Sequence, residues 1–291
     1  MKATRASTTA EGIALARAIE SQKPAEERIC HDPFARQLVS TFYWNVFRFF
    51  VSSGYAERRG PGTLGFVVAR ERYIDDYLQA GLDSGLEQLV ILGAGYDSRA
   101  YRFEQLKGCK VFEVDHPATQ QAKIVKLKKI LGALPAHVVF VPIDFETQTL
   151  QERLVECGYD AHKKTLFIWQ GVTQYLTPEA VDNTLVFVAH HAGQGSSIIF
   201  DYMYTELLDG TVKRSEVNSM QRYRYLTGEG FQFGIPEGTI EAFMQQRGFC
   251  RVKNAAHGEL KRAYFTGVNQ NRAVAAGYAI VSATVQCQEI S

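Results

Sequence analysis

Cysteine is scarce in this chain and is not arranged in pairs. The sequence of 291 residues holds five cysteines, an odd number without a C-x-x-C motif, at positions 30, 109, 157, 250 and 287. Scattered cysteines disfavour both a disulfide framework and a cysteine-bound zinc site. The adjacent histidines His190 and His191 point about 100° apart on a helix, so they cannot share one metal-ligand face. The sequence therefore predicts reduced cysteines and no metal centre.

Long apolar runs and an excess of one charge are also missing. No stretch approaches the ~20 apolar residues that a bilayer-spanning helix needs, and the opening residues MKATR are not followed by a signal-peptide core. With 32 basic and 31 acidic residues, the formal net charge is +1, so no global field attracts nucleic acid or an anionic membrane. We expect a cytoplasmic protein with a small or neutral partner and with neither a nucleic-acid nor a membrane partner.

The pattern that is present is an alternation of strands and helices. Strands are predicted at residues 89–92, 110–114, 137–141, 165–169, 197–201, near 249–254 and at 278–285. Helices are predicted after Asp97 and at residues 117–131, 147–157, 178–191 and 236–247. This alternation predicts an α/β fold with a mostly parallel sheet covered by helices on both faces. Ligands of such sheets bind at the carboxyl ends of the strands.

Two segments outside this alternation suggest how the domain is organised. Residues 1–80 are predicted to form an N-terminal helical lid region, and residues 81–291 an α/β domain with a substrate-covering insertion at 202–233. The two parts are expected to form one integrated domain. The segment 54–65 holds four glycines, a proline and two arginines, which predicts a mobile loop, either a lid near the site or a plain connector.

The turn after the first strand points to a cofactor that contains adenosine. Gly93-Ala94-Gly95 follows the strand at 89–92, and the second strand ends at Asp115, as in doubly wound folds. Ser98 stands where the third glycine of a dinucleotide motif belongs, and Asp97 would repel a diphosphate at the helix N-terminus. S-adenosylmethionine has no phosphate and carries a positive charge. The turn favours S-adenosylmethionine, with a nicotinamide cofactor as the alternative, because two glycines alone are a weak signal.

Two carboxylates at strand ends are candidates for binding the adenosine. Asp115 could accept the two ribose hydroxyls, or it could cap the helix that opens at Pro117. Asp144, at the end of the third strand, could accept from the adenine amino group while Phe145 covers the ring. The alternative for Asp144 is an N-cap of the next helix.

Two further polar residues are candidates for the amino acid part of the cofactor. Gln170 follows the fourth strand and could hydrogen-bond an ammonium group, or simply bond the backbone at the sheet end. Arg70 lies in the helix before the first strand and could clamp a carboxylate, since arginine binds carboxylates bidentately. The alternative for Arg70 is a solvated helix face of mixed charge. The lysines of the helix at 119–130, Lys123 among them, are predicted to be solvated.

Several ordered motifs together resemble the leucine carboxyl methyltransferase family, more closely its bacterial and archaeal branch of S-adenosylmethionine-dependent methyltransferases. The motifs are Ser7-Thr8-Thr9-Ala10, His31-Asp32-Pro33-Phe34-Ala35, Leu92 to Arg99, Phe112 to Pro117, Ile143-Asp144-Phe145, Gln170 to Leu176, Arg70, Arg272 and Tyr278. They span nearly the whole chain. The resemblance implies a class I methyltransferase fold, Rossmann-like, with seven strands of which the last is antiparallel.

The resemblance also implies roles for the site residues. It implies that Arg70 and the turn Gly93-Ala94-Gly95 hold the methionine part of S-adenosylmethionine. Asp115 is then expected to hold the ribose, and Asp144 with Phe145 the adenine. One position departs from the family pattern: Gln170 stands where a glutamate is common, which weakens the contact with the ammonium group. A leucine commonly follows the third-strand aspartate, and Phe145 keeps its apolar role.

The predicted activity is O-methyl transfer to a carboxylate or phenolic hydroxyl, in a small molecule or at a protein C-terminus. A carboxylate is already ionised at neutral pH and needs no general base, whereas a phenol needs one. His116, Tyr175 and Tyr202 are possible bases, but no motif singles one out, and no catalytic residue is assigned. The alternatives are a nicotinamide-dependent oxidoreductase and a cofactor-binding module without catalysis.

Overall fold

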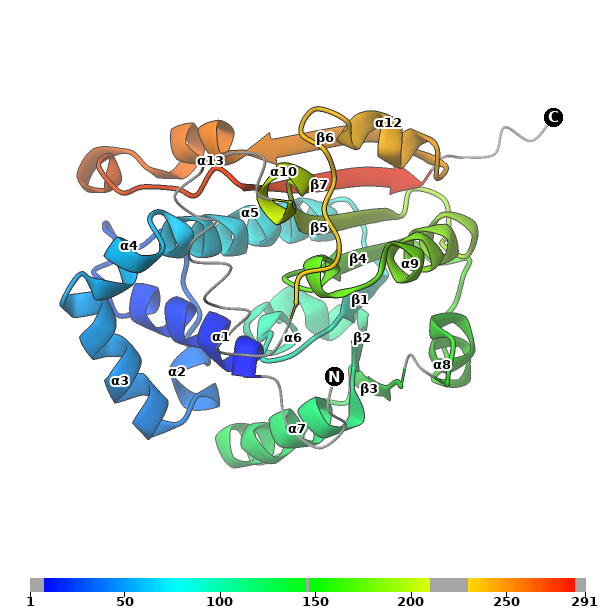
Figure 1. Cartoon of the computed structure of the whole chain (residues 1–291). Coiled ribbons are helices and arrows are strands. Elements are labelled where there is room, and N and C mark those ends of the chain that lie inside the picture. Colours follow the sequence, from blue (N-terminus) through cyan, green and yellow to red (C-terminus); the bar gives the residue numbers. More distant parts are fainter. Residues whose placement is uncertain (1–7, 145–146, 210–229, 286–291) are drawn as a thin grey trace.

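The computed structural model, which describes residues 8–144, 147–209 and 230–285, is built around one seven-stranded sheet (Figure 1). The strands follow the spatial order β3-β2-β1-β4-β5-β7-β6. Their bounds are β1 Gln88–Leu92, β2 Lys110–Asp115, β3 Val138–Pro142, β4 Thr165–Trp169, β5 Ser197–Met203, β6 Phe249–Ala256 and β7 Tyr278–Val285. β1 to β5 pair in parallel, and β7 is antiparallel to both β5 and β6. The predicted sheet with its antiparallel last strand is confirmed.

The helices form three groups along the chain. Before the sheet come α1 Thr8–Ser21, α2 Ala35–Leu38, α3 Thr41–Ser52, α4 Tyr55–Arg59 and α5 Thr63–Asp83. Between β1 and β5 lie α6 Arg99–Arg102, α7 Pro117–Leu131, α8 Leu150–Glu156 and α9 Pro178–His190. After β5 come α10 Thr205–Leu208, α12 Ile240–Gln245 and α13 His257–Tyr264. The described part of the chain has no helix long and apolar enough to cross a membrane.

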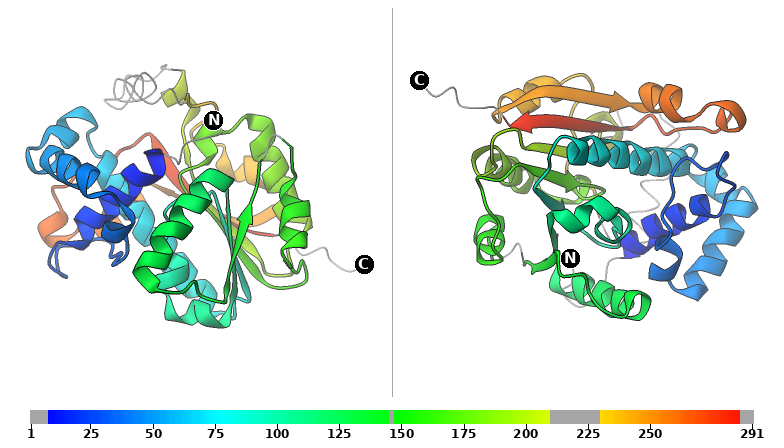
Figure 2. Two further views of the ribbon diagram at one scale, coloured as in Figure 1. Left: turned by 90° about the horizontal axis from the view of Figure 1, so that it is seen from below. Right: turned by 180° about the vertical axis from the view of Figure 1, so that it is seen from behind.

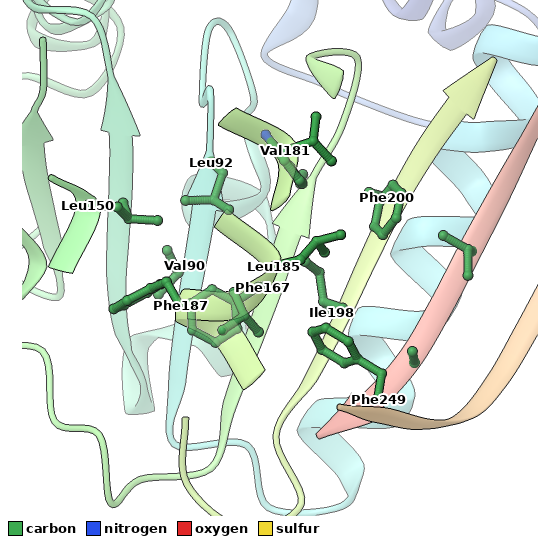
Figure 3. Packing of buried hydrophobic residues seen from close by; sticks show 14 of the residues in the cluster. Val90, Leu92, Leu150, Phe167, Val181, Leu185, Phe187, Ile198, Phe200 and Phe249 are labelled. Carbon is green, nitrogen blue, oxygen red and sulfur yellow. The ribbon is translucent and has the colours of Figure 1, made fainter. Parts of the chain in front are cut away.

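Apolar side chains fill the space on both faces of the sheet because successive residues of a strand point to opposite sides. On one face, Val90 of β1 packs in a cluster with Leu185 of α9 (Figure 3). On the other face, its neighbour Leu89 packs in a cluster with Leu78 of α5. Figure 2 shows α5 lying along the sheet on the side away from α9. Both faces are therefore covered, as predicted for a parallel sheet.

The sheet has a switch point between β1 and β4. The chain runs from β1 to β2 and β3 on one side and returns to β4 on the other side of β1. In open α/β sheets, the carboxyl ends of the strands at such a point form a crevice for ligands. The N-terminal helices cover this end, since Leu15 of α1 and Leu38 of α2 pack in one cluster with Tyr96 of the turn after β1.

The helix predicted after Asp97 is present as the short α6, followed by a 3-10 turn at Glu104–Gly108. The segment 54–65 is not a plain loop, because it contains α4 and the start of α5. A side chain at Gly65 would place its Cβ 2.0 Å from the Ala273 carbonyl oxygen, so this segment is packed against the chain before β7.

The end of β5 also differs from the prediction. The strand continues to Met203, so Tyr202 is a buried strand residue and not part of an insertion. Residues 210–229, which make up most of the predicted insertion at 202–233, lie outside the described residues. The helix predicted at 236–247 is shorter, Ile240–Gln245, and α13 was not predicted. The division at residue 80 stays a prediction, and α5 crosses it.

Candidate active site

The turn after β1 needs glycine at two positions. Gly93 and Gly95 have positive φ angles of 64° and 40°, which favour glycine. A Cβ on Gly93 would lie 2.4 Å from Cγ2 of Val172, and one on Gly95 would lie 3.1 Å from Cβ of Ala10. The turn is therefore held between the loop after β4 and the start of α1. Neither glycine therefore has room for a side chain.

Asp115 ties the end of β2 to this turn. Its Oδ2 accepts from the backbone N–H of Gly95, and its Oδ1 accepts from the N–H of His116 at 2.6 Å. Burial raises the pKa of Asp115, and these two hydrogen bonds oppose that shift. The alternative role as N-cap of α7 is wrong, because His116 caps that helix through its Nδ1, 3.2 Å from the N–H of Ala118.

Arg70 is buried, so the interpretation of a solvated helix face is wrong for this residue. Its Nη1 donates to Oδ2 of Asp201 at 2.5 Å, and only 3% of the residue is exposed. Its Nε and Nη2 are buried without a hydrogen-bond partner among the described residues. Buried donors are nearly always paired in native structures. Two donors of Arg70 are therefore available for a ligand.

Gln170 lies beside α5, the helix that contains Arg70. The next residue, Gly171, packs against the Arg70 guanidinium. Nε2 of Gln170 donates to Oε2 of Glu71 at 2.9 Å, and Oε1 of Gln170 is a buried acceptor with no partner in the described chain. A Cβ on Gly171 would lie 3.4 Å from Nη1 of Arg70. The structure thus brings Arg70 and Gln170 together at the end of β4, and each keeps unused hydrogen-bonding capacity.

Asp201 is a site residue that the sequence did not reveal. Besides Arg70, its carboxylate accepts from the backbone N–H of Gly171 at 2.6 Å, and its carbonyl accepts from Oγ1 of Thr173 at 2.7 Å. Asp201 therefore fixes both Arg70 and the loop after β4. Its position at the predicted end of the fifth strand was the available signal, but nothing in the sequence paired it with Arg70.

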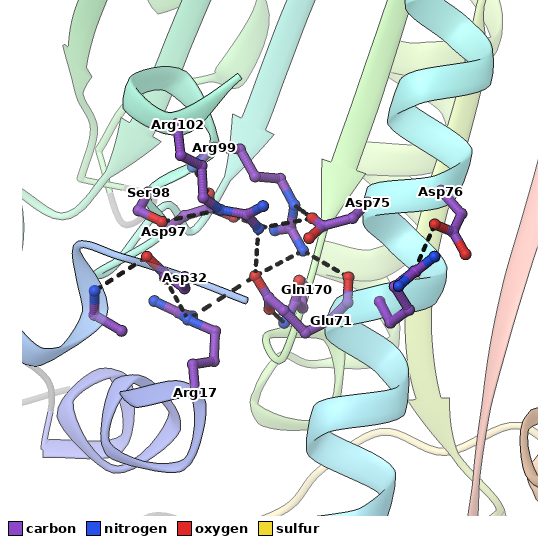
Figure 4. Close-up of polar contacts among 12 residues, drawn as sticks. Arg17, Asp32, Glu71, Asp75, Asp76, Asp97, Ser98, Arg99, Arg102 and Gln170 are labelled. Carbon is purple, nitrogen blue, oxygen red and sulfur yellow. Dashed lines mark hydrogen bonds and ion pairs between the residues drawn. The ribbon is translucent and has the colours of Figure 1, made fainter. Parts of the chain in front are cut away.

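A buried ionic network joins α1, α5 and the turn after β1 (Figure 4). Its members are the arginines Arg17, Arg99 and Arg102 and the acids Asp32, Glu71, Asp75 and Asp97. Glu71 lies at the centre, 3.1 Å from Arg99, 2.9 Å from Arg102 and 3.9 Å from Arg17.

The network changes how its carboxylates titrate. Burial alone would raise the pKa of Glu71, but the charges of Arg99, Arg17 and Arg102 outweigh it and lower that pKa. The pKa of Asp97 is lowered in the same way, chiefly by Arg99 against the effect of burial. Because Asp97 pairs with Arg99, its repulsion of a diphosphate is weaker than that of an unpaired carboxylate.

Asp144 lies at the carboxyl end of β3, on the same edge of the sheet as the turn. Its backbone N–H donates to Oε1 of Gln148 at 3.1 Å, and its carbonyl accepts from the N–H of the same residue. The alternative role as N-cap is wrong, because Thr149 caps α8 in a capping box with Glu152. Phe145 lies outside the described residues.

Comparison with known proteins identifies the family. Residues 10–189 match the family described as Leucine carboxyl methyltransferase, which is more than half of the chain. The chain belongs to the leucine carboxyl methyltransferase family. As a member of this family it is a methyltransferase that uses S-adenosylmethionine. The resemblance seen in the sequence is confirmed.

Relatives of this protein are described as methyltransferases that depend on S-adenosylmethionine. The "Putative S-adenosyl-L-methionine-dependent methyltransferase YktD" of Bacillus subtilis is 32% identical over 70% of this chain and 67% of its own length. A protein of the same description from Mycolicibacterium paratuberculosis is 34% identical, over 86% of this chain and 83% of its own. Among solved structures, a methyltransferase from Thermobifida fusca aligns over 97% of this chain and 96% of its own, with a TM-score of 0.61 and 13% identity. That structure supports the fold alone.

The free polar groups of this methyltransferase fit the amino acid part of S-adenosylmethionine. A carboxylate matches the two unpaired donors of Arg70, and an ammonium group matches the unpaired acceptor of Gln170. The described residues contain no cluster of three or more histidine, cysteine or acidic side chains that could hold a metal ion.

Proposed function

We propose that this methyltransferase transfers a methyl group to an oxygen of a carboxylate or phenol, in a small molecule or at a protein C-terminus, with a carboxylate preferred. The preference rests on the state of the possible bases. His116 uses Nδ1 to cap α7, and Tyr202 is buried, which raises its pKa further above neutral. A phenol acceptor needs a base, whereas a carboxylate does not. Tyr175 is the remaining candidate base.

The proposed cofactor contacts follow the free groups of the site. When bound, S-adenosylmethionine supplies a methyl group on a positively charged sulfur. We assign its carboxylate to Nε and Nη2 of Arg70 and its ammonium to Oε1 of Gln170. Gly93, Ala94 and Gly95 would line the methionine part with backbone. We assign the ribose to Asp115 and the adenine to Asp144 and Phe145.

In this proposal the chain acts mainly by orientation. Asp201 holds Arg70, and Glu71 holds Gln170, so the groups that bind the cofactor are fixed before it arrives. Holding two reactants in line removes much of the entropic barrier to a bimolecular reaction. No residue has to accept a proton when the acceptor is an ionised carboxylate.

The proposal is tested with methyl-labelled S-adenosylmethionine and a panel of carboxylic acids, peptides with a free C-terminus, and phenols. We expect label in base-labile methyl esters. Tyr175→Phe should keep this activity, because no base is needed. Label only in aryl methyl ethers, lost with Tyr175→Phe, would make a phenol the acceptor.

Binding measurements separate the proposal from its two alternatives. Calorimetry should detect S-adenosylhomocysteine and not NAD. Binding of NAD in place of S-adenosylhomocysteine would indicate a nicotinamide enzyme. Cofactor binding without label transfer to any acceptor would indicate a binding module without catalysis.

A further inference from the structure

Helix α3 presents an exposed apolar face. The largest exposed fractions are 71% for Phe42 and 67% for Phe49, and Tyr43, Val46 and Phe50 are also exposed. The rings of Phe50 and Tyr55 lie 5.2 Å apart, which extends the face to α4. Contiguous exposed apolar patches of this kind mark interaction sites in soluble proteins.

The positions of these residues divide α3 into three faces. At 100° per residue, the exposed apolar side chains from Phe42 to Phe50 cover an arc of about 120°. A second face, with Trp44 at its centre, is buried against the protein. Arg48 lies on a third, polar face with Thr41, Asn45 and Ser52. The apolar arc is therefore separate from the face that packs on the protein.

Positive charge is concentrated around this helix. Residues 35–62 contain four arginines and one glutamate, a net charge of +3, whereas the remainder of the chain holds 28 basic and 30 acidic residues, a net charge of −2. Arg48, Arg58 and Arg59 are exposed, and the guanidinium of Arg59 lies 5.0 Å from the ring centre of Tyr55. The apolar face is thus bordered by arginines.

We propose that the apolar face of α3, together with Tyr55, Arg48, Arg58 and Arg59, binds an anionic lipid surface. Aromatic side chains flanked by arginine are typical of helices that lie in the interface of a bilayer. Each arginine near an anionic leaflet adds attraction, and the aromatic rings enter the boundary between headgroups and acyl chains. In Figures 1 and 2, α3 lies at the outer edge of the N-terminal helices.

Charge argues against a second copy of the chain as the occupant. A two-fold contact places the same patch of both copies together, so the arginines that border the face in one copy would lie near those of the other. Like charges brought together at an interface are unfavourable. An anionic lipid surface complements these charges.

The lipid-binding face is coupled structurally to the active site. The backbone N–H of Ser40, the N-cap of α3, donates to Oε1 of Glu11 in α1 at 2.9 Å. The preceding residue, Ala10, packs on Gly95 of the turn after β1. Lipid binding at α3 would therefore hold the covered end of the sheet near the bilayer.

The test is sedimentation of the full-length protein with vesicles of phosphatidylcholine, alone or mixed with phosphatidylglycerol. We expect binding to the mixed vesicles that weakens with added salt. Phe42→Ser/Phe49→Ser should reduce the partition coefficient by about tenfold or more, because two exposed rings no longer enter the bilayer. Arg48→Glu/Arg58→Glu should abolish the preference for phosphatidylglycerol.

The control variant is Val155→Ser/Val268→Ser, which removes exposed apolar side chains on α8 and in the 3-10 turn before β7. It should bind vesicles like the wild type, and all variants should keep the wild-type affinity for S-adenosylhomocysteine. Failure of the wild type to bind either vesicle would overturn the proposal, as would equal losses in both serine variants. A dimer in solution that Phe42→Ser/Phe49→Ser dissociates, without vesicle binding, would make the face a contact between copies.

Discussion

Gln170 shows how one residue depends on a neighbour that the sequence does not indicate. Its Nε2 donates to Glu71, a carboxylate held ionised by three arginines. A glutamate at this position would place a second carboxylate against Glu71 at hydrogen-bond distance. A neutral amide is therefore the side chain that suits this environment, although glutamate is the residue that the family resemblance led us to expect.

The first prediction concerns Gln170→Glu. Without cofactor, this change should lower the free energy of unfolding by about 1–3 kcal/mol, because a charge-assisted hydrogen bond becomes a repulsion between carboxylates. Urea unfolding measures the effect. Gln246→Glu, at an exposed position after α12, is the control and should change stability little. Equal stability of Gln170→Glu and the wild type would contradict the contact with Glu71.

Asp115 gives a second prediction at this scale. If it holds the ribose, Asp115→Asn should weaken binding of S-adenosylhomocysteine by about 1–3 kcal/mol, because charge-assisted hydrogen bonds are lost. Since the pKa of Asp115 is raised, wild-type affinity should begin to fall, as the pH is lowered, sooner than an ordinary aspartate would cause. Calorimetry between neutral and acidic pH measures both effects. Asp83→Asn, at an exposed position, should bind normally, and an unchanged affinity of Asp115→Asn would refute the assignment.

At the scale of elements, the strands could be predicted far better than the contacts between helices. All seven strands were anticipated, most of them because they are short apolar runs, although β6 contains Arg251, Lys253 and Asn254. The network around Glu71 could not be anticipated, since its members come from α1, α5 and α6 and the segments next to them. Lys123 was predicted to be solvated, yet it is buried and lies 2.7 Å from Glu113 of β2. A charged residue on a helix does not reveal from its spacing whether its partner is water or a strand.

Helix α5 supplies the third prediction, through Glu71. Folding lowers the pKa of Glu71 below the ordinary glutamate value of 4.5. Its charge therefore stabilises the folded protein at any pH above 4.5. This contribution is lost as the pH falls through the pKa of Glu71 in the folded protein. Glu71→Gln should therefore cost about 3 kcal/mol at neutral pH and less in acid. Urea unfolding at several pH values measures this. Glu104→Gln, whose ion pair with Lys107 is exposed, should cost about 1 kcal/mol at most. Equal losses in both variants would contradict the central position of Glu71.

The turn after β1 gives a fourth prediction. Gly93→Ala should destabilise the fold and weaken S-adenosylhomocysteine binding, because the new Cβ meets Val172 and φ is positive. Gly85→Ala is the matched control, since Gly85 has φ of 80° but nothing within 4 Å of its Cβ. It should show only the cost of the positive φ, about 1 kcal/mol. Adding Val172→Ala to Gly93→Ala should recover the steric part of the loss, and no recovery would mean that the cost is not steric.

At the scale of the whole molecule, the net charge does not show where the charges lie. The net charge of +1 was interpreted as the absence of any attraction to a membrane, but it is the sum of a positive N-terminal segment and a slightly negative remainder. The proposed lipid-binding face differs from that expectation for this reason. The antiparallel last strand, in contrast, was implied by the family resemblance and is confirmed.

Helix α1 touches the turn through Arg17, whose guanidinium donates to the carbonyl of Tyr96. The packing of α1 on the protein and the binding of the cofactor therefore both involve the turn after β1. By thermodynamic linkage, whatever the docked helix adds to cofactor affinity, the cofactor adds to the docking of the helix. S-adenosylhomocysteine should slow hydrogen exchange in α1, and Arg17→Ala should reduce both that protection and the affinity. Unchanged exchange in α1 would mean that the N-terminal helices and the turn behave as independent units.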